Sequence, residues 1–314
     1  MPPIRAFDIT HWDRDFDFPV FPQGARAKWA VFSPTNAFVY PLAAGRRQLF
    51  KYSLPRYPTE FWSEIVAYHI GAHLGIDVPL AYPAFDTVAG HAGALIEWFY
   101  EDGVERFVPA GDLFQRVVPG FDRKRGSQHN FITVMEIRDG LSSFATVDPA
   151  WYIRWGEMLF LDALTGNGDR HQDNWGIIVR SDNPDGDQHQ RRIAMAPAFD
   201  NGSSLGREYP DEKLAQLDAA WIGRYVERGH HHIKWRATDK RGQPHLSLLI
   251  HLARVFPACK TRMRMLALSS IEPIIEAIRA FTALEFPAPL SVERAQFMER
   301  LLRARLARLH SALV

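Results

Sequence analysis

The sequence predicts an α+β fold in two lobes, a small β-rich N-terminal lobe over residues 1–100 and a mostly helical C-terminal lobe over residues 101–314. Apolar residues in the first hundred positions form short runs between turn residues, which is typical of strands. Beyond Asp211 they recur mostly at three- and four-residue steps, which is typical of helices. A chain of 314 residues is also longer than one average domain and shorter than two large ones, so two lobes suit its length.

The N-terminal lobe is expected to hold several short strands and one helix. The strands share short length and flanking turn residues, and they cover residues 28–33, 37–41 and 47–53 and two segments after Pro79, the second over 92–100. From Thr59 the apolar period changes to that of a helix, and Gly75 is its expected C-terminal stop. The break at residues 101–103 marks the expected boundary between the lobes.

The first clear helix of the C-terminal lobe is expected after an irregular stretch. Residues 104–147 show no decisive pattern, and 122–130 within them are expected to form a solvated loop. Asp148 and Pro149 suit the N-cap and the first position of a helix that ends at Gly166.

A loop and a hairpin follow that helix. The loop covers residues 167–174, and two strands over 175–180 and 192–196 flank a very polar tip. The remaining chain is expected to be helical, with the last helix over about residues 292–313.

The composition excludes several classes of partner and compartment. A formal net charge of +1 provides no global field for nucleic acid or for an anionic membrane, so neither is expected as a partner. The single cysteine, Cys259, allows no intramolecular disulfide. Because no apolar run has membrane-spanning length and the first residues lack the apolar core of a signal peptide, a cytoplasmic location is expected.

The segment from Gly168 to Asn174 contains an aspartate five residues before an asparagine. In the catalytic loop of kinases this spacing lets the aspartate handle the attacking hydroxyl and the asparagine hold Mg²⁺. Asp169 is therefore the candidate catalytic residue and Asn174 a candidate metal ligand. His171 is a second catalytic candidate that could orient Asp169 or contact phosphate, and a packed loop histidine is its structural alternative.

A second acidic motif, Phe199-Asp200-Asn201-Gly202, follows the expected hairpin. An aspartate at this place can return to the same cleft and bridge Mg²⁺ to the β- and γ-phosphates. Hard oxygen ligands around Mg²⁺ neutralise the charges of the phosphates, and the transfer itself depends mostly on positioning and electrostatics. Asp200 is therefore the second candidate metal ligand, and ATP and Mg²⁺ are the expected cofactors.

Three upstream residues complete the nucleotide-binding candidates. Lys51 lies on an expected strand, and Glu64 lies inside the helix that follows it. A strand lysine that touches the α- and β-phosphates and is held by a helix glutamate is the usual kinase pairing. A lysine in an apolar strand also needs a partner on physical grounds. Glu97, in the expected strand 92–100, is the third candidate.

Two other polar features have structural interpretations. Arg170 suits a pair with a neighbouring carboxylate as well as it suits a contact with ATP. Consecutive residues point in different directions, so His230, His231 and His232 do not form one zinc site on a regular element, and a partly exposed turn after Gly229 is expected instead.

The motifs over residues 168–176 and 196–206 resemble those of the HipA-like kinases, in particular of short stand-alone members. The match covers about residues 24–206 and, more loosely, the helical tail. The resemblance implies a protein-kinase-like two-lobed fold, ATP and Mg²⁺, a protein substrate modified on Ser or Thr, and an antitoxin-like partner. Its residue assignments are Asp169 as catalytic aspartate, Asn174 and Asp200 as metal ligands, Lys51 as phosphate lysine and Glu64 as its partner.

The chain departs from the family in one loop, and two other functions stay open. Well-studied members have a Ser- and Gly-bearing loop over ATP with an autophosphorylated serine, whereas residues 24–36 contain one glycine, with Ser33 and Thr35 as hydroxyl residues. Phosphoinositide kinases share the order Gly-Asp-Arg-His-x-x-Asn, so a lipid or small-molecule hydroxyl is one alternative acceptor, although few cations follow Asp200. The other alternative is a pseudokinase that binds nucleotide or a partner protein without transfer.

Overall fold

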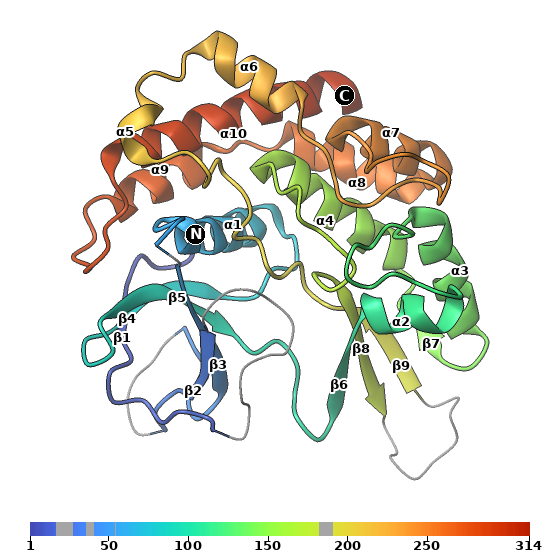
Figure 1. Ribbon diagram of the computed structural model, residues 1–314, viewed down its shortest axis with the longest axis horizontal. Helices are drawn as coiled ribbons and strands as arrows, with labels where there is room; N and C mark the ends of the chain where they lie inside the picture. The colour runs from blue at the N-terminus through green and yellow to red at the C-terminus, as the bar shows by residue number, and fades with distance from the viewer. Residues whose placement is uncertain (17–27, 36–40, 54, 182–190) are drawn as a thin grey trace. The chain divides into compact units, whose positions relative to one another are not determined.

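The computed structural model describes residues 1–16, 28–35, 41–53, 55–181 and 191–314 (Figure 1). Residues 24–27 and 36 of the glycine-poor loop, residues 37–40 of an expected strand and residues 182–190 of the hairpin tip lie outside this description. The chain forms two compact units. The first unit contains Met1–Trp98, Asn201–Val226 and Ser269–Ala304, and the second contains Phe99–Asp200, Glu227–Leu268 and Arg305–Val314.

The first unit is built on a five-stranded sheet in the order β1-β4-β5-β3-β2. Its strands are β1 (Phe7–Asp8), β2 (Lys28–Phe32), β3 (Arg47–Tyr52), β4 (Ala81–Asp86) and β5 (His91–Glu97). Strands β2 to β5 pair antiparallel with their neighbours, and β1 joins β4 in parallel. The expected strands over 28–33, 47–53 and 92–100 are thereby confirmed in type, with ends shifted by one to three residues.

Helix α1 (Glu60–Leu74) follows the strand β3, as the change of period predicts. It ends at Gly75, whose left-handed φ of 65° turns the chain so that the Ile76 N–H reaches the Gly71 carbonyl at 2.9 Å. Almost every residue of α1 is buried, including the polar side chains of Glu60, Glu64 and His69. Buried charged groups require partners, and both glutamates have them, Glu64 in Lys51 and Glu60 in Arg207.

Four later helices complete the first unit wholly or in part: α5 (Asp211–Leu214), α6 (Ala219–Glu227), α9 (Glu272–Phe281) and most of α10 (Val292–Leu313). An apolar cluster holds three of them together, because Leu214, Ile222 and Val226 pack with Phe297 and Leu301 of α10. The last helix has the predicted bounds, and its final residues, from Arg305 on, belong to the second unit.

The second unit contains a four-stranded sheet in the order β6-β8-β9-β7. Its strands are β6 (Glu105–Pro109), β7 (Thr146–Val147), β8 (Gly176–Ser181) and β9 (Arg191–Met195). Strands β8 and β9 pair antiparallel, which confirms the predicted hairpin. The irregular stretch before them also contains α2 (Ala110–Val117) and α3 (Phe131–Ser142).

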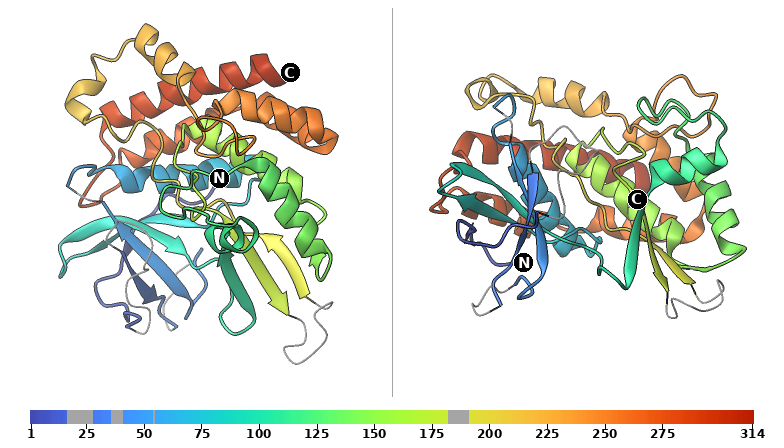
Figure 2. Two further views of the ribbon diagram at one scale, coloured as in Figure 1. Left: turned by 45° about the vertical axis from the view of Figure 1, so that its right-hand side comes forward. Right: turned by 60° about the horizontal axis from the view of Figure 1, so that its bottom comes forward.

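Helix α4 (Trp151–Thr165) lies at the centre of the second unit, with α7 (His245–Val255) and α8 (Pro257–Leu268) beside it in both Figure 1 and Figure 2. The predicted N-cap at Asp148 is wrong by two residues, since the helix begins after Ala150. The Asp148 carboxylate instead accepts the Ala150 N–H at 2.9 Å and closes the turn before the helix. The predicted end is confirmed, with Gly166 at a left-handed φ of 78°.

The prediction of a solvated loop over residues 122–130 is wrong for its last two residues. His129 and Asn130 are almost fully buried there, and the Asn130 side chain caps α3 by accepting the Thr133 N–H at 3.0 Å. Within the described residues, no helix is both long and apolar enough to cross a membrane.

Candidate active site

The first unit contains a buried ion pair between Lys51 and Glu64. The Lys51 Nζ lies 2.8 Å from the Glu64 Oε1, and the two residues are only 7% and 4% exposed. Strand β3 presents the lysine, and the first turns of α1 present the glutamate. The structure therefore brings together the two residues that the motif analysis paired.

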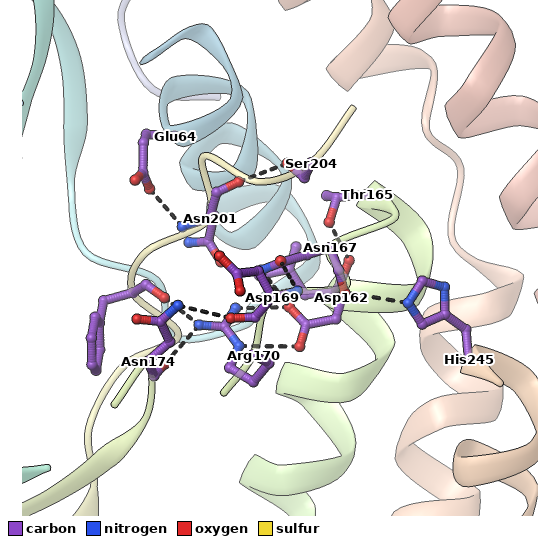
Figure 3. A network of polar contacts seen from close by, with 12 residues as sticks. Glu64, Asp162, Thr165, Asn167, Asp169, Arg170, Asn174, Asn201, Ser204 and His245 are labelled. Carbon is purple, nitrogen blue, oxygen red and sulfur yellow. Dashed lines mark hydrogen bonds and ion pairs between the residues drawn. The ribbon is translucent and has the colours of Figure 1, made fainter. Parts of the chain in front are cut away.

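The second oxygen of Glu64 holds the backbone just after Asp200. Its Oε2 accepts the Asn201 N–H at 2.8 Å (Figure 3). The same segment is tied to α1 again by Ser63, whose hydroxyl donates to the Ser204 carbonyl at 3.0 Å. One carboxylate therefore connects the candidate phosphate lysine with the chain next to a candidate metal ligand.

Glu97 does not join this group. Strand pairing places Gln48 opposite Glu97 and Lys51 opposite Ala94. Because successive side chains of a strand alternate between its faces, Glu97 lies on the face of the sheet opposite to Lys51. Burial raises the pKa of the Glu97 carboxyl above its ordinary value.

The candidate catalytic loop in the second unit is organised around Arg170, which has no exposed surface. Its guanidinium grips the Asp162 carboxylate of α4 through two nitrogens, at 3.1 Å from Nε and 2.7 Å from Nη2 (Figure 3). Its Nη1 donates to the carbonyls of Asn174, at 2.9 Å, and Phe199. Of the two interpretations of Arg170, the structure thus supports the carboxylate pair.

Asp162 is a residue that the sequence analysis missed. Burial raises the pKa of its carboxyl above the ordinary value, and the Arg170 guanidinium opposes that rise. The signal was present in the sequence, because an aspartate in the apolar helix segment Met158-Leu-Phe-Leu-Asp162-Ala-Leu requires a buried partner.

Asp169 and Asn174 are brought together by a hydrogen bond across the loop. The Asn174 Nδ2 donates to the Asp169 carbonyl at 2.8 Å. Since a carbonyl only accepts, the amide nitrogen must face Asp169, and the Asn174 Oδ1 is left as the atom suited to a hard cation. The arrangement of this loop therefore suits Asn174 as an Mg²⁺ ligand.

Asp200 has an uncommon backbone conformation. Its φ of 57° lies in the left-handed region, which residues with a side chain rarely adopt. The residues on either side are fixed, since the Phe199 carbonyl accepts from Arg170 and the Asn201 N–H donates to Glu64. Strained backbone that is held from both sides is typical of functional positions.

His171 occupies a packed position in the same loop. Its Nδ1 accepts the Asp173 N–H at 3.1 Å, and its ring centroid lies 6.0 Å from that of His232. His232 is in turn 3.4 Å from the Nδ1 of His129, whose Nε2 accepts the Trp175 indole N–H at 3.0 Å. An indole N–H can only donate, so the neutral His129 ring carries its proton on Nδ1 and donates it to His232.

The histidines after Gly229 point to different neighbours. The ring of His231 packs 4.5 Å from that of His245, whereas His232 faces His129 and His171. The expected partly exposed turn is wrong for His231, which is 2% exposed. Among the described residues no group of three or more histidine, cysteine or acidic side chains is arranged to hold a metal ion.

Ser33, one of the hydroxyl residues of the glycine-poor loop, has a structural use. Its side chain is buried, donates to the Ala43 carbonyl at 2.6 Å and accepts the Arg46 N–H at 3.0 Å. These bonds join the end of β2 to the residues just before β3.

Solved structures match this fold, although no family model and no curated protein matches the sequence. One is the proinflammatory kinase CtkA of Helicobacter pylori, with a TM-score of 0.72 and 17% identity over 98% of this chain and 97% of that one. Another is the toxin–antitoxin complex of HipA, HipB and operator DNA from Shewanella oneidensis MR-1, with a TM-score of 0.51 and 16% identity. That match covers 94% of this chain and 65% of the other.

These neighbours decide the fold class. The predicted α+β, protein-kinase-like fold is confirmed. The HipA neighbour also agrees with the resemblance to HipA-like kinases that the motifs indicate.

Proposed function

We propose that this chain is a HipA-like phosphotransferase that moves the γ-phosphate of ATP, with Mg²⁺, to a serine or threonine hydroxyl of a protein. One observation carries the proposal: the Glu64 carboxylate binds the Lys51 ammonium with one oxygen and the N–H next to Asp200 with the other. A buried lysine fixed in this way is a preorganised cation for the phosphates of a nucleotide.

Four of the candidate residues have roles in this proposal that follow from their chemistry. Lys51 would bind the α- and β-phosphates, and Asp169 would accept the proton of the attacking hydroxyl. Asn174 and Asp200 supply the oxygen atoms suited to Mg²⁺, and the bound cation would neutralise charge that develops on the transferred group. Arg170 is reserved for structure, since all three of its guanidinium nitrogens hold other protein groups.

The proposal is tested by transfer from γ-labelled ATP with Mg²⁺, with the protein itself and a generic basic protein as acceptors. The wild type is compared with Asp200→Asn and with Asp139→Asn, which makes the same change at an exposed aspartate of α3. We expect label with the wild type and with Asp139→Asn, and strong loss with Asp200→Asn.

The other outcomes are equally informative. Mg²⁺-dependent ATP binding without any label would favour a small-molecule acceptor or a pseudokinase. Absence of ATP binding would overturn the proposal as a whole.

An antitoxin-like partner is a further part of the proposal. Its support is the Shewanella complex, in which a protein of this fold is assembled with HipB. Native mass spectrometry of the protein purified from its own host would show a stoichiometric complex with a second small protein, and a monomer alone would count against this part.

A further inference from the structure

The C-terminal part of the chain reaches the catalytic loop of the second unit through a buried arginine. Arg305, on α10, is 3% exposed, and its Nη1 donates to the Ala163 carbonyl at 3.2 Å. That carbonyl belongs to the last turn of α4, where unpaired carbonyl groups carry partial negative charge. The guanidinium also lies against Gly166, where a Cβ would come within 2.5 Å of its Nη2.

His245, the first residue of α7, contacts both Arg305 and the catalytic loop. Its Nε2 lies 3.3 Å from the Asn167 carbonyl, and its Nδ1 lies 3.4 Å from the Arg305 Nη1. A carbonyl can only accept and a guanidinium can only donate, so His245 must carry its proton on Nε2 and accept at Nδ1. Burial, with His231 and Arg305 nearby, lowers the pKa of His245 well below its ordinary value, which agrees with a neutral ring.

Asn167 links these residues to Asp169 through hydrogen bonds. Its Oδ1 accepts the Asp169 N–H at 3.0 Å, while its Nδ2 donates to the Asp162 Oδ1 at 3.2 Å (Figure 3). Its own N–H donates to the Asp162 carbonyl at 2.9 Å. With the bond from His245, every polar group of Asn167 is engaged, so its position is set by its neighbours.

We propose that His245 and Arg305 are positioning residues for Asp169, acting through Asn167. They come from two helices far along the chain and fix the backbone from which the Asp169 carboxylate projects. This inference rests on the proposed function for its catalytic meaning. The geometric part of the inference is that these two residues order the loop 167–175. It can be tested without a measurement of enzymatic activity.

The test compares two replacements of His245 with a matched control. His245→Met has a similar length but donates no hydrogen bond, whereas the amide of His245→Gln can donate to the Asn167 carbonyl and accept from Arg305. His251→Met makes the first change on the same helix, where the ring instead packs 5.1 Å from Trp235. The measurements are kcat, KM for ATP, the thermal midpoint, and amide hydrogen exchange of the peptide 167–175.

We expect His245→Met to lower kcat by about 10- to 100-fold, since small displacements of a catalytic group have such effects. KM for ATP should stay within about twofold, because the phosphate-binding side chains are elsewhere. Hydrogen exchange should accelerate in the peptide 167–175, and His245→Gln should recover most of both losses. His251→Met should change neither.

Two results would overturn the inference. One is wild-type kcat and wild-type exchange of the loop in His245→Met. The other is an equal loss in the Met and Gln variants, with faster exchange throughout the second unit, which would indicate a general packing role. If the wild type itself transfers no phosphate, the proposed function fails, and the exchange data alone decide whether His245 orders the loop.

Discussion

Lys51 and Glu64 show how strongly single residues depend on each other inside the first unit. Both side chains are almost fully buried, so removal of either charge takes a close counterion away from the other in a poorly hydrated place. Glu64 has the additional task of accepting the Asn201 N–H, which a neutral amide at the same position could still do.

A stability prediction follows for this pair. Lys51→Met should lower the free energy of unfolding by about 3 kcal/mol or more, because it removes the counterion that lies 2.8 Å from the buried Glu64 carboxylate. The double variant Lys51→Met/Glu64→Gln should recover part of this loss, since neither member of the pair is then charged. Urea unfolding of the two variants and the wild type measures the difference, and a double variant no more stable than the single one would contradict the argument.

The role of Asp169 can be separated from its backbone contacts. Asp169→Asn keeps the size of the side chain and the backbone bonds to Asn167 and Asn174, but it removes the carboxylate. We expect the rate of phosphate transfer to fall by about 100-fold or more, with ATP affinity nearly unchanged. Calorimetric titration with ATP and Mg²⁺ alongside the transfer assay checks this, and a parallel loss of ATP binding would instead assign Asp169 a structural role.

At the scale of elements, α1 is the helix of the first unit that binds the segment just after Asp200. Its residues Glu60, Ser63 and Glu64 are spaced as neighbours on one face of a helix. Glu60 pairs with Arg207, Ser63 binds the Ser204 carbonyl and Glu64 binds the Asn201 N–H. A rotation or shift of α1 would therefore alter all three contacts at once.

The C-terminal end of α4 provides a test of how the candidate catalytic loop begins. Gly166→Ala puts a side chain at a left-handed φ and drives its Cβ toward Arg305, so it should cost about 1–2 kcal/mol or more. The matched control is Gly140→Ala inside α3, where a Cβ meets nothing within 4 Å. That change should stabilise the protein by about 0.5–1 kcal/mol. Urea unfolding should give shifts of opposite sign, and equal shifts would refute the cap argument.

At the scale of the whole molecule, buried histidines link stability to pH. Burial lowers the pKa of His69 to about 4 and that of His231 to about 3, and it lowers the pKa values of His129 and His245 well below the ordinary 6.5. Neither ring nitrogen of His69 has a hydrogen-bond partner in the described part of the chain. A proton on these rings would therefore be poorly accommodated in the folded state.

The sign of the pH dependence follows from these shifts. As the pH falls below about 6.5, the unfolded chain takes up protons at these histidines while the folded chain does not. The free energy of unfolding should therefore keep its full value above pH 7 and fall on acidification, by at most about 1.4 kcal/mol per pH unit for each histidine. Urea unfolding at pH 7.5 and 5.5 measures the loss, and His69→Leu should reduce it. A midpoint independent of pH over this range would contradict the assignment.

Local patterns in the sequence determined the elements and the order of the motifs. The helix that ends at Gly75, the helix that ends at Gly166 and the β8–β9 hairpin follow from apolar periods and turn residues, which act over a few neighbouring positions. The pairing of Lys51 with Glu64 was also accessible, because a lysine in an apolar strand needs a buried partner and the next helix offered one.

Only the tertiary structure decided what surrounds the candidate catalytic loop. The bonds of Arg170 to the Phe199 carbonyl, of His245 to the Asn167 carbonyl and of Arg305 to the Ala163 carbonyl all connect segments that are far apart in sequence. The uncommon φ of Asp200 and the burial of His231 likewise depend on what packs around them. A buried polar group must find a partner, but which partner it finds is set by the packing of distant segments, and no local pattern encodes that choice.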